Sequence, residues 1–208
     1  MVKLKLIYVL VILAVLAGCD FGTSVDEQLK KVIDELNHME VDYREAQETV
    51  FQYEQQEQQL FNETMELTKD RQEELAAKVT ELKKLLGQRL AFLEKEEASI
   101  EEAKKSAMDL DKVLDDDDEN NKKMIEQLKS VVNERYELHD AFVSEYKKLT
   151  TLQNELYEML IDNRTGLSRL NEQVKEVNVQ KEEVQSAISI FNEATTRVNA
   201  LLEDIDFN

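Results

Sequence analysis

The chain has 208 residues, of which 45 are acidic and 26 are basic, so its formal net charge at neutral pH is −19. This acidic excess argues against nucleic-acid binding, because lysine and arginine are needed to displace the counterions of phosphate. It also argues against a body that lies flat on anionic lipid, where clustered basic residues would be expected.

At the N-terminus, residues 1–18 have the pattern of a bacterial lipoprotein signal peptide. Two lysines precede an apolar run at 6–17, which is shorter than the roughly 20 residues that a bilayer-spanning helix needs. The run leads into Leu-Ala-Gly-Cys at 16–19, and the thiol of Cys19 can carry a diacylglycerol thioether. We therefore expect cleavage before Cys19, lipidation of Cys19 and a short anchored linker at 19–23. The alternative is an ordinary secretory signal with a chance cysteine.

The remaining residues, 24–208, are predicted to form one helical bundle domain. The chain has no proline, and Gly22, Gly87 and Gly166 are the glycines that follow the signal. Proline inside a helix costs about 3 kcal/mol, so its absence over this length favours long uninterrupted helices. A single cysteine excludes an internal disulfide, so the stability of the domain must come from packing.

Apolar residues recur along this domain in four runs with alternating three- and four-residue steps, the spacing of coiled-coil seams. The first run, 29–60, is interrupted at Glu57, and the second, 75–114, is offset from it. The third and fourth runs are 125–160 and 167–205. Each run gives its helix a single apolar stripe to bury.

Three breaks separate the runs. The acidic stretch 115–121 concentrates poor helix formers and mutually repelling charges, and 162–168 combines turn residues with a glycine. A third break is inferred around 61–64, where the seam loses phase and Asn62 or Thr64 could cap a new helix.

With these breaks the helices would span 24–61, 65–113, 120–161 and 166–205. Four comparable lengths predict an all-α fold, an elongated up-and-down bundle of about four long helices. Without the third break the first two helices would fuse, giving a long three-helix or hairpin coiled coil. The four-helix arrangement is favoured because it buries every stripe inside one molecule.

The aromatic residues divide by their position relative to the seams. Five lie on a seam and are expected in the core and not on a sugar-stacking platform: Tyr43, Tyr53, Phe142, Tyr146 and Phe191. Four lie beside a seam and are expected to be partly exposed: Phe51, Phe92, Tyr136 and Tyr157.

The two histidines give little support to metal chemistry. Glu35 and His38 resemble half of a carboxylate-bridged di-iron site, but a second half would need glutamate where Tyr136 precedes His139. Chance is the simpler explanation in a glutamate-rich helix. His139 lies on the third seam and is expected to be a hydrogen-bonded core histidine.

Other motifs carry no specific chemistry. The acidic run 115–119 could attract Ca²⁺ weakly, but it lacks the alternation and the glycine of an EF-hand. Asn62 and Asn163 fit glycosylation sequons and are expected to mark surface turns. The sequence contains no phosphate-binding glycine loop, hydrolytic triad or Cys/His metal spacing. We therefore expect no catalytic residue, no cofactor site and no metal site.

Together, the Leu-Ala-Gly-Cys motif at 16–19, the proline-free acidic helical body and the early helix beginning Ser-Val-Asp-Glu-Gln-Leu at 24–29 carry a family resemblance. The chain resembles the YkyA-type lipoproteins of Bacillus and its relatives, over essentially the whole mature chain. The resemblance implies a long up-and-down helical bundle, lipidation at Cys19 and a suggested role in cell-wall association at the envelope. It brings no catalytic residues.

Two functional classes follow. The favoured one is a non-enzymatic envelope protein, a helical spacer or adaptor anchored by lipid on Cys19 to the extracytoplasmic face of the membrane, with a cell-wall polymer or an envelope protein as partner. The other is an envelope (peptidoglycan) hydrolase or its regulator, which would need two carboxylates about 5–10 Å apart across a cleft. Because the anionic polymers of a Gram-positive wall would repel an acidic body, wall binding would require divalent bridging, uncharged glycan contacts or a protein partner.

Overall fold

The computed structural model of the chain describes residues 25–67, 71–113 and 119–204. These residues form helices and no strand, which confirms the all-α prediction. The helices are α1 (Val25–Met39), α2 (Val41–Met65), α3 (Gln72–Ala107), α4 (Leu110–Val113), α5 (Glu119–Ile161) and α6 (Leu167–Asp204).

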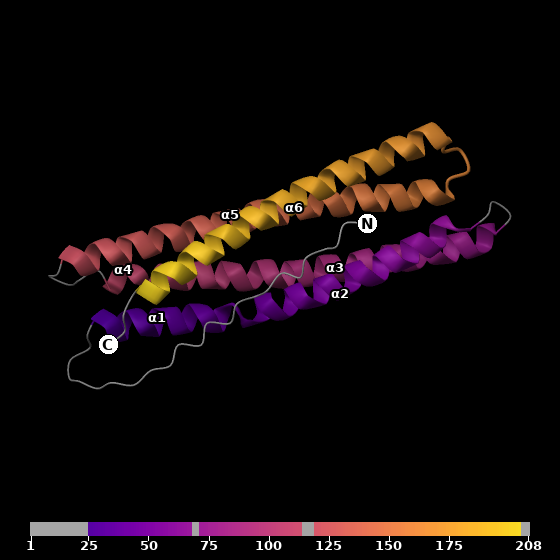
Figure 1. The fold of residues 1–208 in the computed structure, drawn as a ribbon. Coiled ribbons are helices and arrows are strands. Elements are labelled where there is room, and N and C mark those ends of the chain that lie inside the picture. The colour runs from indigo at the N-terminus through magenta and orange to yellow at the C-terminus, as the bar shows by residue number, and fades with distance from the viewer. Residues whose placement is uncertain (1–24, 68–70, 114–118, 205–208) are drawn as a thin grey trace.

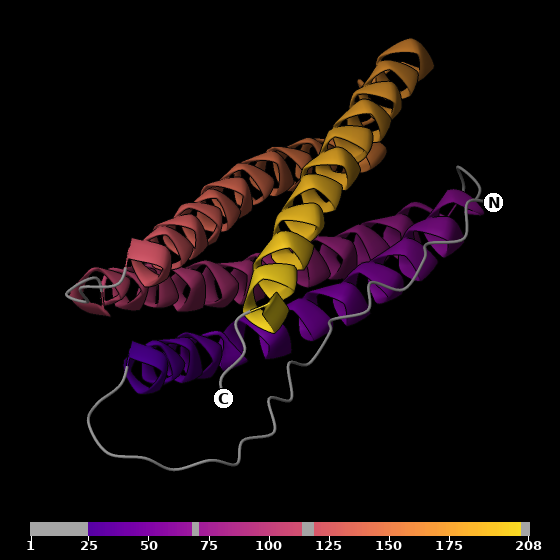
Figure 2. The same ribbon diagram turned by 60° about the vertical axis from the view of Figure 1, so that its left-hand side comes forward.

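The helices make four long rods arranged as an elongated bundle (Figure 1). The rods are α1 with α2, α3 with α4, then α5 and α6. α2 packs along α3 and α5 along α6, and the two hairpins meet mainly where α3 contacts α5. Figure 2 shows that α6 runs obliquely to α2 and α3 and diverges from them toward its own N-terminus. The predicted four-helix bundle is confirmed, and the alternative in which the first two helices fuse is wrong.

The turn predicted near Asn62 lies further along the chain. α2 continues to Met65, and α3 begins at Gln72. Thr64 is buried inside α2 and its hydroxyl donates a 2.6 Å hydrogen bond to the carbonyl of Leu60, so neither Asn62 nor Thr64 caps α3. Since Leu60 and Thr64 both face the core, the helix gains burial by extending past the point where the seam loses phase. The predicted helices 120–161 and 166–205 match α5 and α6 to within one residue.

One interruption, between α1 and α2, was not predicted. The hydroxyl of Ser99 on α3 accepts a 3.1 Å hydrogen bond from the Tyr43 amide and donates a 2.5 Å bond to the Met39 carbonyl. These are the two backbone groups that an unbroken helix would join to each other, so a side chain has entered the helical ladder. The apolar stripe continues across the gap, which is why spacing alone does not reveal it.

A second unpredicted interruption separates α3 from α4. The amide of Met108 bonds to the carbonyl of Lys105, and that of Asp109 to the carbonyl of Ser106, at 3.2 and 3.0 Å. These three-residue steps tighten the last turn of the helix in the manner of a 3₁₀ turn. The chain keeps its direction, so α3 and α4 act as one rod.

The apolar core follows the long axis as three clusters, built from the predicted stripes. One cluster joins α1, α3, α4 and α5 with Tyr43 of α2 and Phe191 of α6, and the others occupy the middle of the bundle and its far end. The prediction that Tyr136 and Tyr157 are partly exposed is wrong, because only 1% and 3% of their surfaces are accessible to solvent. Tyr53, expected in the core, is half-buried, whereas Phe51 and Phe92 are half-buried as expected.

Candidate functional site

Several predicted features lie outside the described residues. These are the signal at 1–18, the lipid-bearing Cys19, the linker 19–23 and most of the acidic run 115–119. They therefore stay predictions. Across 25–67, 71–113 and 119–204, no helix has the length and apolarity needed to cross a membrane.

The described candidates do not assemble a metal centre. Glu35 and His38 are exposed on α1, and no group of three or more His, Cys, Asp or Glu side chains in the described part of the chain could hold a metal ion. Asn163 is exposed in the connection between α5 and α6, as expected, whereas Asn62 lies on α2 and not in a turn. His139 is fully buried on α5, where a core histidine was predicted.

Charged side chains occur inside the core, which was not predicted. Three of them lie at gaps of the seams. Glu57 is the residue that interrupts the first seam, Glu96 falls between Leu93 and Ile100, and Arg135 falls shortly before His139. Among the described acidic and basic side chains, the strongly buried ones are Glu57, Arg89, Glu96, Arg135 and His139.

The first group, called here the Arg89 cluster, joins α2, α3 and α5. Arg89 approaches Glu57 at 3.2 Å and donates a 2.8 Å hydrogen bond to the side-chain carbonyl of Gln153. Tyr157 donates a 2.5 Å bond to the other oxygen of Glu57, and the Arg89 guanidinium lies 5.3 Å from the ring centroid of Tyr146. Burial raises the pKa of Glu57, and the charge of Arg89 opposes that rise. The cluster is a buried ion pair in which the Arg89 Nε and one Glu57 oxygen make no hydrogen bond.

The second group is the pair His139–Glu96, which joins α5 to α3. The imidazole Nε2 lies 3.0 Å from a Glu96 oxygen, and both side chains are 1% exposed. The rings of Tyr43, Phe142 and Phe191 surround the imidazole at centroid distances of 5.7, 6.0 and 5.4 Å. Burial raises the pKa of Glu96, and the hydrogen bond from His139 lowers it in part. The histidine has the surroundings of a packed core residue and not of a metal ligand.

The third group, the Arg135 cluster, forms at the interruption between α1 and α2. Arg135 binds both oxygens of Glu40, at 2.6 and 2.8 Å, and donates a 2.9 Å bond from Nε to the hydroxyl of Thr195 on α6. Tyr136 donates a 3.1 Å bond to Glu40. The Ser99 insertion ends α1 at this point and so lets Glu40 face α5. The cluster ties three of the four rods together.

These groups are unsuited to catalysis on a polymer. A glycoside hydrolase needs two carboxylates that face each other across an accessible cleft, whereas Glu57 and Glu96 are 2% and 1% exposed and each is engaged by a basic partner. Their chemistry is used inside the bundle. The buried acids Glu57 and Glu96 therefore take part in contacts between helices.

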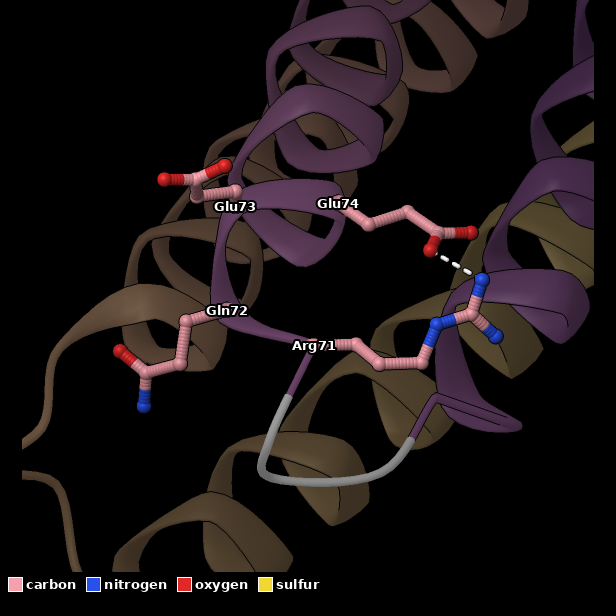
Figure 3. Close-up of a pocket in the computed structure, with 4 residues that line it drawn as sticks. All are labelled: Arg71, Gln72, Glu73 and Glu74. Carbon is pink, nitrogen blue, oxygen red and sulfur yellow. Dashed lines mark ion pairs between the residues drawn. The ribbon is translucent and has the colours of Figure 1, made fainter.

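A surface hollow at the start of α3 does not supply the missing cleft. It is open to solvent and is lined by Arg71, Gln72, Glu73 and Glu74. Figure 3 shows the Glu73 and Glu74 carboxyl groups pointing in opposite directions, with Glu74 in an ion pair with Arg71. Two acids that do not face each other cannot act on the two sides of one bond.

Breaking the Arg89 cluster should strongly destabilise the protein. Arg89→Met leaves Glu57 buried without its cation, and we expect a loss of about 3–5 kcal/mol in the free energy of unfolding. Arg197→Met, which removes a surface arginine paired with Glu134, is the control and should change stability little. Denaturant unfolding of the mature protein measures both. An equally small effect of the two substitutions would contradict the assignment of Arg89 and Glu57 as a buried ion pair that the fold depends on.

Replacing Glu96 should change the pH dependence of stability. Because burial raises the pKa of Glu96 above its unfolded value, the native state holds a proton that the unfolded state releases. The contribution of Glu96 to the free energy of unfolding is complete below about pH 4.5 and is lost as the pH rises through the folded-state pKa of this residue. Between those values the free energy of unfolding of the wild type should therefore fall relative to that of Glu96→Gln.

Unfolding curves at several pH values between 4.5 and neutrality provide this measurement. The same substitution at exposed Glu94 is the control, and it should leave the slope of the wild type unchanged. Parallel pH profiles for wild type and Glu96→Gln would show that Glu96 titrates as it does in the unfolded chain.

Known proteins resemble this chain both in sequence and in fold. A curated relative, an uncharacterized lipoprotein YkyA of Bacillus subtilis (strain 168), is 26% identical over 198 residues, covering 92% of this chain and 86% of the relative. The crystal structure of a conserved protein of unknown function from Staphylococcus aureus superimposes with a TM-score of 0.77 at 23% identity, covering 88% of this chain and 92% of that one. The latter likeness concerns the fold alone.

The family assignment rests on the body of the bundle. Residues 24–206 match the YkyA family, whose description is "Putative cell-wall binding lipoprotein". The matched segment contains all six helices and the three buried polar groups. The family name describes no enzymatic activity. The chain belongs to the YkyA family of lipoproteins.

Proposed function

We propose that this protein is a non-enzymatic adaptor or spacer, anchored by lipid at the extracytoplasmic face of the membrane and associated with the cell wall. The observation that carries the proposal is the closed core. The two carboxylates buried deepest, Glu57 and Glu96, are held by Arg89 and His139, so neither of them is available to a substrate. The cell-wall part of the proposal is supported by the family description.

The proposed layout is a cleaved signal at 1–18, a lipidated Cys19, a linker at 19–23 and the bundle from residue 24. Loss of the signal removes two lysines, so the mature chain carries a net charge of −21. α5 has 43 residues and is about 65 Å long at 1.5 Å per residue. A tether of this kind holds a long acidic body at the membrane while anionic lipid repels it, which favours a position that projects away from the bilayer.

The anchor is tested by Cys19→Ala. Because thioether formation requires the thiol, the variant should lose labelling by a fatty-acid analogue and should appear in the soluble fraction of fractionated cells. Cys19→Ser, which keeps a similar size and polarity, should behave like Cys19→Ala. Labelling of either variant at the level of the wild type would show that Cys19 is not the lipidated residue.

Wall association without catalysis is tested by sedimentation with purified peptidoglycan sacculi. The mature protein should pellet with the sacculi while no soluble glycan fragments or peptides are released in the same tube. A known muramidase serves as the positive control for release. Release of fragments by the mature protein would favour the hydrolase, and failure to pellet would remove the support for wall binding.

A further inference from the structure

The outer surface of α2 includes a long stretch without exposed charge. Charged residues make up 34% of the chain, yet between Glu48 and Glu63 every side chain in the exposed class is a neutral amide. The two acids of this segment do not break the pattern, because Glu57 is buried and Glu54 accepts a 2.6 Å hydrogen bond from Tyr146. The six exposed residues, called here the amide face, are Gln52, Gln55, Gln56, Gln58, Gln59 and Asn62.

The amide face is continuous and points away from the core. Gln52, Gln55, Gln59 and Asn62 follow one another at three- and four-residue steps, so they lie on one side of the helix. From Gln52 to Asn62 the face extends about 15 Å at 1.5 Å per residue. α2 is an outer rod that packs mainly on α3, which leaves its opposite side uncovered (Figure 2).

Much of the hydrogen-bonding capacity of the amide face is not used within the protein. Gln58 donates to Asn62 and Gln59 to Glu63, both at 3.1 Å. In the described part of the chain Gln52, Gln55 and Gln56 make no side-chain hydrogen bond. Each of these amides offers two donors and one acceptor oxygen without a charge.

Aromatic rings border the amide face. Tyr53 is half-buried and packs against Phe92 of α3, with ring centroids 5.8 Å apart. The Lys95 ammonium lies 4.4 Å from the Phe92 ring centroid. Phe51 is also half-buried and directly precedes Gln52, the first residue of the amide face. A sugar presents polar hydroxyl groups and apolar C–H faces. Neutral amides can hydrogen-bond to the hydroxyl groups, and partly exposed aromatic rings can pack against the C–H faces.

Charge and polarity indicate which kind of ligand the amide face can bind. An anionic wall polymer is disfavoured, because the mature chain carries a charge of −21 and the amide face holds no cation. A protein partner is disfavoured, because interface cores depend on buried apolar anchors. The large apolar side chains that the described residues expose all lie outside the amide face: Met65, Met108, Ile161, Leu167, Val179 and Ile190.

We infer that the amide face of α2 binds the uncharged glycan strand of peptidoglycan, through hydrogen bonds to sugar hydroxyl and acetamido groups. This inference rests on the proposed wall association and names the surface and the ligand that carry it. Tyr53 and Phe92 contribute ring contact at the border of the face, and the neutral amides avoid the repulsion that a carboxylate-rich helix would add.

The test uses the full mature protein and sacculi from which covalently attached anionic polymers have been removed. The triple variant Gln52→Glu, Gln55→Glu and Gln56→Glu keeps the size of each side chain and should weaken pelleting at least tenfold. Gln127→Glu, Asn178→Asp and Gln185→Glu, at exposed positions of α5 and α6, add the same three charges elsewhere and should bind as the wild type does.

A second variant separates lost hydrogen bonds from added charge. Gln52→Ala, Gln55→Ala and Gln56→Ala keeps the helix, since alanine has the higher helix propensity, and it should also weaken binding at least tenfold. Direct titration with a neutral N-acetylglucosamine oligomer should give chemical-shift changes confined to residues 49–62 and the Phe92 region.

The outcomes distinguish this inference from the proposed function. Undiminished pelleting of both amide-face variants overturns the assignment of this surface and leaves wall association standing. Pelleting of the wild type that occurs only with sacculi retaining anionic polymers overturns the uncharged ligand. Failure of the wild type to pellet with any sacculi overturns the proposed wall association itself.

Discussion

The bundle depends on charged groups that fix the register of its helices. Long helices with apolar stripes can slide past each other by one turn and still bury leucine and valine against leucine and valine. A slip of 5.4 Å would separate Arg89 from Glu57, which are 3.2 Å apart, and leave both charges buried without a partner. Since such an uncompensated charge costs about 3–5 kcal/mol, the polar groups penalise alternatives that the apolar seams would tolerate.

The three buried groups act on different parts of the bundle. The Arg89 cluster sets α2 against α3 and α5, and the pair His139–Glu96 sets α3 against α5. The Arg135 cluster joins the end of α1 to α5 and α6. α6 otherwise bonds to α5 through Gln173, Gln180 and the surface ion pair of Arg197 with Glu134. The buried charged groups therefore act mainly on the first three rods.

The sequence predicts the apolar part of this fold because helical spacing is a local property. Residues such as Leu82 and Ile125 are buried as their stripes require. Glu57 was recognised as an interruption and not as a core residue, because a glutamate on a helix resembles a solvated one until its partner on another helix is known. The same limit explains the misplaced turn near residue 62 and the unpredicted end of α1, which depends on Ser99, a residue 60 positions away from Met39.

For the buried polar residues, too, the sequence predicts positions along a helix but not the partners on other helices. His139 was placed in the core by its position on a seam, but its partner Glu96 is 43 residues away in sequence and was not identified. Tyr136 and Tyr157 were expected nearer the surface because they lie beside a stripe. They are buried because their hydroxyls donate to Glu40 and Glu57, so a polar partner widens the buried face beyond the apolar residues. Cys19 remains a prediction from its motif.

The closed core restricts where an envelope function can reside. Once the buried acids are occupied by helix packing, recognition must be carried by the surface, and the amide face is a part of that surface that carries neutral hydrogen-bonding groups in place of charge. Val25 and Gln52 are 27 residues apart along α1 and α2, about 40 Å at 1.5 Å per residue. An N-terminal lipid anchor would thus leave the amide face far from the anchored end of its rod. The first rod combines the functions of spacer and contact surface, and the charged core keeps it in register with the helices that support it.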